Sequence, residues 1–489
     1  MGERTRASSL IFSLIIVFVA CLSHVLGDVH SAKQKQDHQM KKMQAFKASF
    51  VRRHSISNIA PPPRRFSPAP ITSSAVTVTP GPRVYHVTSY GADPTGKLDS
   101  TQAILQAISD ALQGPTNGFL MQGISNLGGA QINLEGGNYL ISQPLQFPIV
   151  GQGNLVIHGG TLKASDNFPT DGYLLDLSTS SNHAPEYFFE FITLRDLLVD
   201  CNFRGGGIQV INSLRTSIDN CYITHFTTTG IFVKGGHETY IRNSFLGQHI
   251  TAGGDKGERN FSGTAIHLIG NDNSVTDVVI FSAEIGIIVS GQANLLSGVH
   301  CYNKATGFGG TGIYLKVAGL TQTRIVDSYL DYTGIVAEDP VQLQISHTFF
   351  LGDAFITFKS INGVVNGVNI VDNMFSGSNR GIDIVQLDQS NGPFKKIDQV
   401  VVDRNNVKGM NVKATIASGV AQGNGTSWTL DLNPILIFPN LIKNVQYTFS
   451  PSGNSFVNHV LRNVSNNRVF IESNVQVSAS VFVMADQGK

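Results

Sequence analysis

The chain of 489 residues has few charged side chains, since Asp, Glu, Lys and Arg make up 14% of it and the formal net charge is +1. A total so close to zero excludes a protein that holds nucleic acid over its whole surface. Four cysteines are too few for a disulfide framework. Gly is abundant instead, with 50 residues beside an ordinary 41% hydrophobic share. This composition favours short strands joined by tight turns.

Motifs for cofactors are also missing. No Cys/His set has the spacing of a zinc site, and no Gly-rich phosphate loop opens a helix. The sequence therefore predicts no metal and no cofactor.

Only one long apolar run occurs, at residues 10–26, and it follows Arg4 and Arg6 and precedes Gly27. This layout is typical of a secretory signal peptide over residues 1–27, and the alternative is a membrane anchor. We predict a secreted, extracellular protein with no membrane contact after the signal is removed. Three Asn-X-Ser/Thr acceptors for glycosylation agree with that route: Asn260, Asn424 and Asn463.

Residues 28–83 are polar, basic and rich in Pro, with ten Lys or Arg residues against two Asp. Such a segment has little apolar surface to bury, so we predict a flexible leader. A tether to an acidic polymer is the functional alternative.

A strand-like element recurs through the middle of the chain. Gly-Ile-X-Val appears as GIQV at 207, GIFV at 230, AIHL at 265, GIIV at 286 and GIYL at 312, with looser copies FITF at 355 and GIDI at 381. Between the copies, an Asn or Asp recurs every 20 to 34 residues. Units this small cannot bury their own apolar face, so they are typical of stacked coils.

The β-branched and aromatic composition of each unit favours strands, which predicts an all-β, right-handed parallel β-helix over residues 84–408. The recurring polar residues are predicted to be left-handed turn residues that hydrogen-bond along the stack. They are Asp196, Asn220, Asn243, Asp277, Asp327 and Asp372, with Gly298 and His347 in two copies.

Both ends of the stack are predicted to be covered. A capping helix is expected to begin at Asp99, with Gln102 completing a capping box. Its apolar face is Ile104, Ala107, Ile108 and Ala111. Residues 409–489 are assigned to further strands that cap the other end.

In Gly-Ile-X-Val-X, alternation directs Ile and Val inward and both X positions outward. On neighbouring coils the outward positions include ammonium groups, which bind carboxylates, and aromatic surface, which packs against rings. The predicted binding residues on this face are Lys234, His267, Tyr314, Lys316 and Lys359, and they suit an acidic polymer. An ordinary solvated strand face is the alternative.

The segments YGADPTGKLDSTQAI, GNDNSVTD, GVHCYN and SYLDYTGIVAEDP resemble plant quartet-type polygalacturonases in the pectate-lyase-like superfamily. The resemblance covers most of residues 84–489. It implies a secreted glycoside hydrolase of the family 28 type that acts by inversion, without a metal, on pectic polygalacturonate in the plant cell wall.

The catalytic motifs of that family match in part. Glu284 lies where the first Asp of the family's Asp-Asp pair is expected, but Ile285 replaces the second. Lys316 matches the Lys of Arg-Ile-Lys, whereas Tyr314 replaces the Arg. Asn-Thr-Asp and Gly-His-Gly are missing.

Glycoside hydrolysis takes two carboxyl groups, about 6.5 to 9.5 Å apart in inverting enzymes. We predict Glu284 as the acid, with Asp272 or Asp255 as its partner. The protein is expected to act as a monomer. Two alternatives remain open: a pectate lyase on the same fold, and a non-catalytic β-helix that binds wall polysaccharide.

Overall fold

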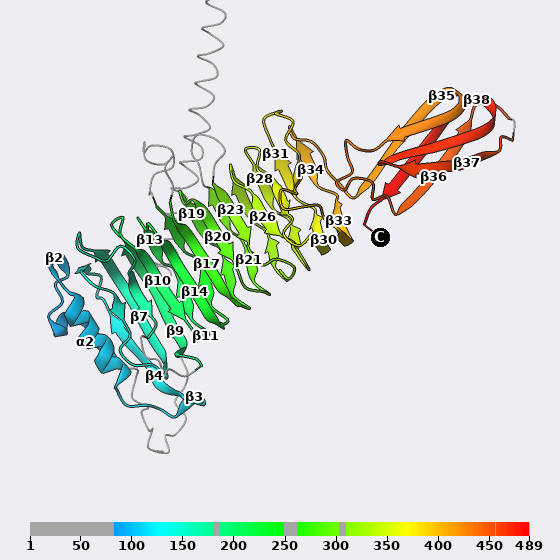
Figure 1. Ribbon diagram of the computed structural model, residues 1–489. Coiled ribbons are helices and arrows are strands. Elements are labelled where there is room, and N and C mark those ends of the chain that lie inside the picture. Colours follow the sequence, from blue (N-terminus) through cyan, green and yellow to red (C-terminus); the bar gives the residue numbers. More distant parts are fainter. Residues whose placement is uncertain (1–82, 180–185, 249–261, 303–309, 455, 489) are drawn as a thin grey trace, which may run out of the picture. The chain divides into compact units, whose positions relative to one another are not determined.

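The computed structural model describes residues 83–179, 186–248, 262–302, 310–454 and 456–488. Within them, thirty-four short strands form one continuous sheet that winds into stacked coils (Figure 1). All pairings in that sheet are parallel except the one between β3 (Phe119–Met121) and β4 (Ile124–Asn133). The predicted right-handed parallel β-helix is therefore confirmed.

Each coil contributes to three sheets, which we call sheets 1, 2 and 3 in chain order. Sheet 1 contains β6 (Leu145–Gln146), β8 (Tyr173–Leu177), β10 (Gly206–Ile211), β14 (Thr229–His237), β17 (Thr264–Asn271), β20 (Ile285–Val289), β23 (Thr311–Leu315), β26 (Ile335–Glu338), β29 (Ile356–Lys359) and β32 (Val385–Asp388). Sheet 2 contains β12 (Ser217–Asp219), β15 (Tyr240–Arg242), β18 (Ser274–Thr276), β21 (Leu295–Ser297), β24 (Arg324–Val326), β27 (Gln344–Ser346), β30 (Val364–Val371) and β33 (Lys396–Asp403). Sheet 3 contains β13 (Tyr222–Thr224), β16 (Phe245–Gly247), β19 (Val279–Phe281), β22 (His300–Tyr302), β25 (Tyr329–Asp331), β28 (Phe349–Leu351), β31 (Met374–Ser376) and β34 (Asn406–Lys408).

The first coils contain β1 (Val84–His86), β2 (Thr95–Asp99), β5 (Asn138–Ile141) and the two longer strands β7 (Gln152–Ala164) and β9 (Phe189–Asp200). The two-residue β11 (Ser213–Leu214) pairs with both β9 and β14. β7 pairs with β9 over ten register positions.

The core fills the inside of the coils. Successive copies of the repeat superpose Ile208 on Ile231, and Ile231 on Ile266, and so on along sheet 1. Every inward aliphatic residue of this row is at most 1% exposed: Ile208, Ile231, Ile266, Ile287, Ile313, Ile335 and Ile356. Because each coil buries its apolar residues against the next, the stack rather than any single coil is the stable unit.

The recurring polar column has the predicted backbone. Each of its eight residues has a positive φ between 51° and 64°. One predicted hydrogen bond along the stack also occurs, because the Asn220 Nδ2 donates to Asp196 Oδ1 over 2.6 Å. These Asp and Asn residues thus have the left-handed backbone of turn residues.

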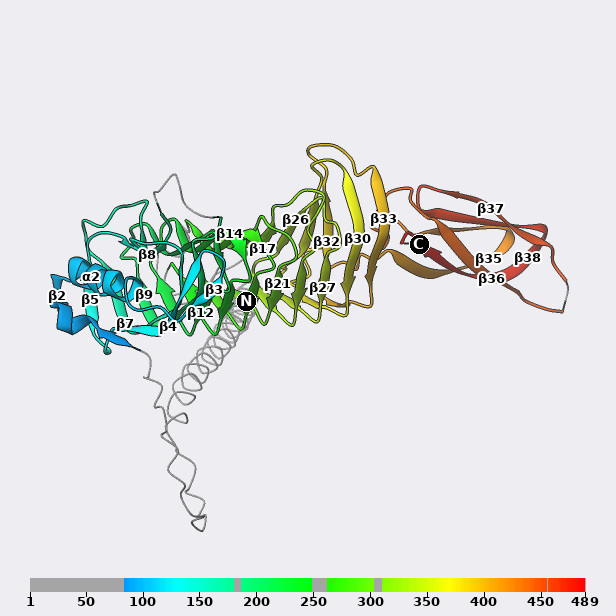
Figure 2. The ribbon, with the colours of Figure 1, turned by 90° about the horizontal axis from the view of Figure 1, so that it is seen from below.

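A capping helix, α2 (Thr101–Leu112), lies at the N-terminal end of the stack (Figure 2). Its predicted apolar residues are 0 to 2% exposed. The predicted start is wrong by one residue, because Ser100 is the N-cap and makes no side-chain cap bond. Asp99 instead accepts a hydrogen bond from the Thr101 backbone N–H over 3.0 Å.

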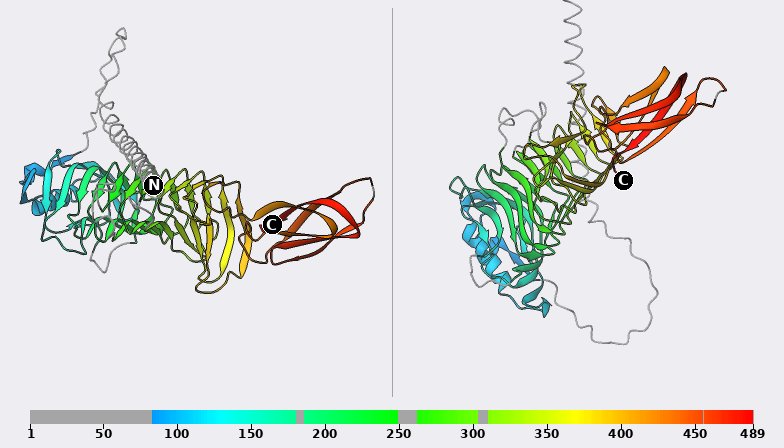
Figure 3. Two further views of the ribbon diagram at one scale, coloured as in Figure 1. Left: turned by 90° about the horizontal axis from the view of Figure 1, so that it is seen from above. Right: turned by 45° about the vertical axis from the view of Figure 1, so that its right-hand side comes forward.

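The parallel stack ends at β33 and β34, and an antiparallel four-stranded sheet follows (Figure 3). Its strands are β35 (Ile416–Asp431), β36 (Asn444–Pro451), β37 (His459–Ser465) and β38 (Arg468–Asp486), in the order β35–β38–β36 with β37 also paired to β38. It has a core of its own around Trp428. Phe438, from the connection between β35 and β36, packs in the core of the coils.

Cys201, Cys221 and Cys301 are buried free thiols. Within the described ranges, no helix is long and apolar enough to cross a membrane. The predicted signal peptide and the predicted leader up to residue 82 lie outside the described residues.

Candidate functional site

The outer face of sheet 1 carries the predicted binding residues in two columns. The register superposes Asp176, Gln209, Phe232, His267, Ile288, Tyr314, Val336, Thr357 and Gln386 in the first column. In the second column, Lys234 lies beside Ile269. Further along the same column, Lys316 is followed by Glu338 and then by Lys359. Successive members are one strand spacing apart, about 4.8 Å.

A row of rings occupies the N-terminal part of this face. Tyr173 stacks on Phe232 with centroids 6.1 Å apart, and Phe232 meets His267 edge to face at 5.5 Å. Beside them, the carboxylate of Asp176 accepts hydrogen bonds from Gln209 Nε2 at 3.2 Å and Gln146 Nε2 at 3.3 Å. Burial raises the pKa of Asp176 despite these bonds. The row therefore offers apolar ring surface next to amide groups, as a sugar requires.

His267 and Lys316 form the middle of the face. The His267 Nε2 lies 3.3 Å from Ser290 Oγ. Burial, followed by the nearby Lys316 charge, lowers the pKa of His267 below its usual 6.5. A neutral imidazole is a hydrogen-bonding group rather than a cation here. Lys316 and Lys234 are exposed, and among the described residues neither has an ion-pair partner.

Tyr314 and Lys359 lie in one cluster, joined by a carboxylate that the repeat pattern did not reveal. The Tyr314 hydroxyl donates to Glu338 Oε1 over 2.6 Å. Lys359 Nζ donates to the same oxygen over 3.3 Å and to the Tyr314 hydroxyl over 3.1 Å. Lys359 is one of the predicted binding residues, and Glu338 already neutralises its ammonium group. Lys359 therefore presents no unpaired cation to a ligand.

Glu284 lies on the turn that leads from sheet 3 into β20 and is exposed. Its backbone carbonyl accepts a hydrogen bond from the Thr311 N–H over 3.0 Å, which fixes this turn to the next coil. The strand that follows Glu284 begins beside Thr264, the first residue of β17. Glu284 is thus at the entry edge of sheet 1.

Asp272 lies at the opposite edge. It follows the last residue of the eight-residue strand β17, so it is on the order of 20 Å from the Glu284 turn. Its carboxylate pairs instead with His237 Nδ1 at 3.3 Å. The predicted pairing of Asp272 with Glu284 is therefore wrong, because their separation is about twice what inverting hydrolysis uses. Asp255 lies outside the described residues.

Asp331, at the end of β25, is a second carboxylate on the turn between sheets 3 and 1. The register superposes Phe281, Tyr302 and Asp331 on three successive coils. Asp331 is 5% exposed, and no hydrogen bond to its carboxylate occurs in the described part of the chain. Burial raises the pKa of Asp331 to about 6. A desolvated carboxylate of this kind is a stronger base than an ordinary one.

Comparisons with known proteins agree with this architecture. The family described as "Rhamnogalacturonase A/epimerase, pectate lyase-like" matches residues 84–309. The Arabidopsis thaliana protein named Polygalacturonase QRT3 is 64% identical over 480 residues, which cover 96% of this chain and 98% of that protein. The chain belongs to the quartet-type polygalacturonase family.

Solved structures similar to this quartet-type polygalacturonase chain are distant in sequence. The ORF18 protein of Geobacillus virus E2 is 12% identical, with a TM-score of 0.54 over 81% of this chain and 77% of that chain. The endo-xylogalacturonan hydrolase of Aspergillus tubingensis is 12% identical, with a TM-score of 0.43 over 68% of this chain and 95% of that chain. The likeness to the viral protein shows the fold alone.

Two side chains of this quartet-type polygalacturonase escaped the sequence pattern. Glu338 follows Ala337, which replaces the aliphatic residue that marks each copy of the repeat, so the coil GIVAE does not match the repeat pattern. Asp331 belongs to sheet 3, which the Gly-Ile-X-Val repeat does not include. The spacing of the repeat is the sequence signal that locates Glu338. The burial of Asp331 depends on tertiary contacts, which the repeat does not report.

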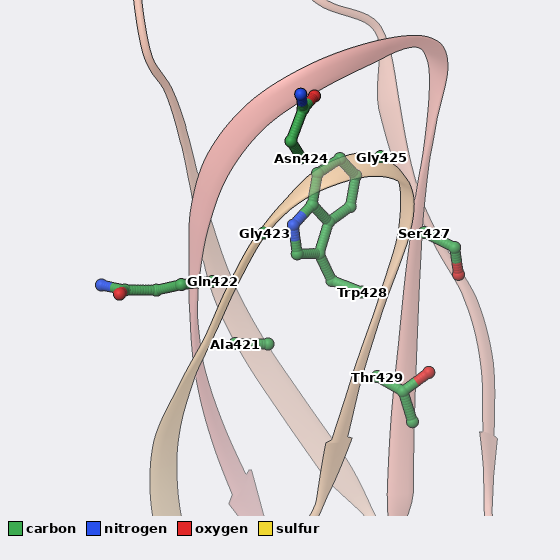
Figure 4. Close-up of a pocket in the computed structure, with 8 residues that line it drawn as sticks. All are labelled: Ala421, Gln422, Gly423, Asn424, Gly425, Ser427, Trp428 and Thr429. Carbon is green, nitrogen blue, oxygen red and sulfur yellow. The ribbon is translucent and has the colours of Figure 1, made fainter.

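The pocket in Figure 4 lies far from these carboxylates in sequence, on β35 of the C-terminal sheet. Its volume is about 260 Å³, and Gln422, Asn424, Ser427, Trp428 and Thr429 contribute side chains to it. The Trp428 Nε1 is buried and has no hydrogen-bond partner among the described residues. Because no ionisable side chain lines the pocket, it lacks the carboxyl groups that glycoside hydrolysis requires.

Two predicted glycosylation acceptors, Asn424 and Asn463, are exposed on strands of the C-terminal sheet. Asn424 lies next to a register shift between Gly425 and Ser427. The third acceptor, Asn260, lies outside the described residues.

Proposed function

We propose that this protein is a secreted polygalacturonase that hydrolyses the α-1,4-galacturonosidic bonds of pectin in the plant cell wall. The observation that carries the proposal is the 64% identity with a protein named as a polygalacturonase over nearly the whole of both chains. The sheet 1 face supports it, because Lys234 and Lys316, which have no ion-pair partner among the described residues, lie on the same face as a row of rings. Ammonium groups and ring faces along a line suit an extended uronate polymer.

For the chemistry we assign Glu284 as the acid that protonates the leaving glycosidic oxygen, with inversion at the sugar carbon. Asp331 replaces Asp272 as the proposed partner that activates water. It stacks two coils from Phe281, an axial offset of about 9.6 Å, which is just beyond the upper end of the carboxyl separation in inverting enzymes, and Glu284 follows Phe281 by three residues in the same turn. A raised pKa makes the Asp331 carboxylate a better acceptor for the proton of that water.

The test is an assay of purified protein on polygalacturonate that follows new reducing ends and the ultraviolet absorbance of unsaturated products, with and without a chelator. Hydrolysis predicts reducing ends without absorbance. Absorbance that disappears with the chelator supports a lyase instead, and binding without either signal supports a non-catalytic wall protein.

Two variants sharpen the assignment. Glu284→Gln is expected to abolish reducing ends, because the amide carries no transferable proton. Asp272→Asn is the matched control, since Asp272 is also an exposed carboxylate next to sheet 1 but at the wrong edge. Full activity in Glu284→Gln, or an equal loss in both variants, would contradict the role of Glu284.

Secretion and glycosylation form a separate part of the proposal and rest on the sequence. Protein recovered from the medium of plant cells is expected to begin at Asp28, directly after the proposed signal. Treatment with an N-glycan-releasing enzyme is expected to lower its apparent mass, and Asn424→Gln and Asn463→Gln should each remove one step of that change. An unshifted mass or a retained N-terminus would oppose this route.

A further inference from the structure

The second outward column of sheet 1 changes its charge along the stack. Lys234 and Lys316 are exposed cations, and neither has an ion-pair partner in the described residues. One coil beyond Lys316, the column reaches Glu338, followed by Lys359 and then Asp388. The face is thus cationic around Lys316 and balanced or slightly anionic beyond it.

Glu338 creates this charge balance because its carboxylate contacts the side chains of Tyr314 and Lys359. Its Oε1 accepts hydrogen bonds from both the Tyr314 hydroxyl and Lys359 Nζ. The Glu338 side chain is 11% exposed and that of Lys359 is 29% exposed, so water screens the pair only in part. The Lys359 ammonium also lies 5.7 Å from the centroid of the Tyr314 ring. The three side chains therefore form one unit whose net charge is zero.

The cluster leaves one hydrogen-bond donor of Lys359 and a limited apolar surface available to a ligand. An ammonium has three donors, and two of them are used within the cluster. The third can bind a carbonyl oxygen. The Tyr314 ring and Val336, its neighbour in the first column, supply apolar surface, and Thr357 supplies a hydroxyl.

We propose that Tyr314, Glu338 and Lys359 form a subsite for an uncharged, methyl-esterified galacturonate unit, with Glu338 as the residue that determines this preference. The inference rests on the proposed function. A free uronate placed here faces the Glu338 carboxylate and gains no unpaired cation. A methyl ester keeps the carbonyl acceptor for Lys359 and adds a methyl group for the Tyr314 ring and Val336.

The experiment compares two ligands of equal length, an unesterified and a methyl-esterified oligogalacturonate, by titration calorimetry. The titrations use the Glu284→Gln background, and chromatography afterwards verifies that the oligomers are intact. Binding is measured for the parent and for Glu338→Gln, which retains a hydrogen-bond acceptor but leaves Lys359 without its counter-charge. The ratio of the two dissociation constants is the readout.

Glu338→Gln is expected to shift this ratio about tenfold towards the unesterified ligand, which corresponds to about 1.4 kcal/mol. Lys359→Gln leaves the Glu338 charge unpaired and is expected to shift the ratio in the opposite direction. Opposite shifts cannot arise from a general loss of folding, and thermal melts of each variant verify that it is folded.

Unchanged ratios, or shifts of the same sign in both variants, would overturn the subsite while leaving the proposed function intact. Failure of the parent to bind either oligomer would overturn the proposed function and the subsite with it. Lys316→Met is the control for the cationic part of the face, and it should weaken the unesterified ligand alone.

Discussion

Replacing Asp331 by Asn is expected to stabilise the protein at neutral pH. Burial raises the pKa of Asp331 from 3.8 to about 6. The folded state therefore favours the protonated acid more than the unfolded state does. The ionised form costs about 1.4 kcal/mol per pKa unit, which gives about 3 kcal/mol above pH 6. Asn is isosteric and uncharged, so it avoids this cost.

The sign follows from linkage. A carboxyl group whose pKa is raised on folding does not destabilise the protein below its unfolded pKa, where both states are protonated. The cost appears as the pH rises from about 4 to about 6 and is constant above. The gain in Asp331→Asn should therefore be up to about 3 kcal/mol at pH 7.5 and below about 1 kcal/mol at pH 4.

Urea unfolding at both pH values measures the difference, provided that the slope of the free energy against urea is unchanged. Asp372→Asn is the control and is expected to lower the stability at pH 7.5, because hydrogen bonds from Arg404 lower the pKa of Asp372. A loss of stability in Asp331→Asn at pH 7.5, or an equal gain at both pH values, would refute the account of Asp331. A gain in stability together with lost hydrolysis is the result that a catalytic base in a destabilised site predicts.

Three further predictions concern binding and packing. Lys316→Met is expected to weaken polygalacturonate binding about tenfold at low ionic strength and less at high salt, and a titration with the same salt dependence as the parent would contradict it. Asp339→Ala should lower the free energy of unfolding in urea by about 3 to 5 kcal/mol. The fully buried Asp339 carboxylate accepts hydrogen bonds from the backbone N–H groups of residues 361–364. A decrease of less than about 1 kcal/mol would contradict this expectation. Gly236→Ala should cost more than about 2 kcal/mol, since Gly236 has a φ of 68° and an added Cβ would lie 2.0 Å from the Ser213 carbonyl oxygen; a melt unchanged from that of the parent is the opposing result.

The fold can be predicted from the sequence because each coil repeats the same local residue pattern. The aliphatic pair in Gly-Ile-X-Val is buried in every copy, and the polar turn residues all have positive φ. Both features depend on a residue and its close neighbours, so a pattern along the chain reports them. The helix start lies one residue later than predicted because Ser100 is the N-cap, although the Asp99 side chain still accepts a hydrogen bond from the Thr101 N–H.

The site was less accessible because it depends on which outward residues meet across coils. The side chains of Tyr314 and Lys359 were found by alternation, but the carboxylate that joins them was missed when Ala337 broke the repeat. Asp272 was placed near Glu284 because they belong to adjacent coils, although they lie at opposite edges of sheet 1. Coil number alone therefore does not give proximity, and the position within the strand is equally necessary.

This architecture separates the two tasks of each strand. Inward residues such as Ile313 pack against the coils above and below, and their loss opens a cavity that costs about 2 to 5 kcal/mol. Outward residues such as Lys316 contact no ion partner among the described residues, so a substitution there changes the ligand surface at little cost in stability. Specificity on sheet 1 can thus change one coil at a time in steps of about 4.8 Å. Glu338 and Asp331 depart from this rule because they face outward yet are buried, and a buried ionisable group at an outward position points to a role in the site rather than in packing.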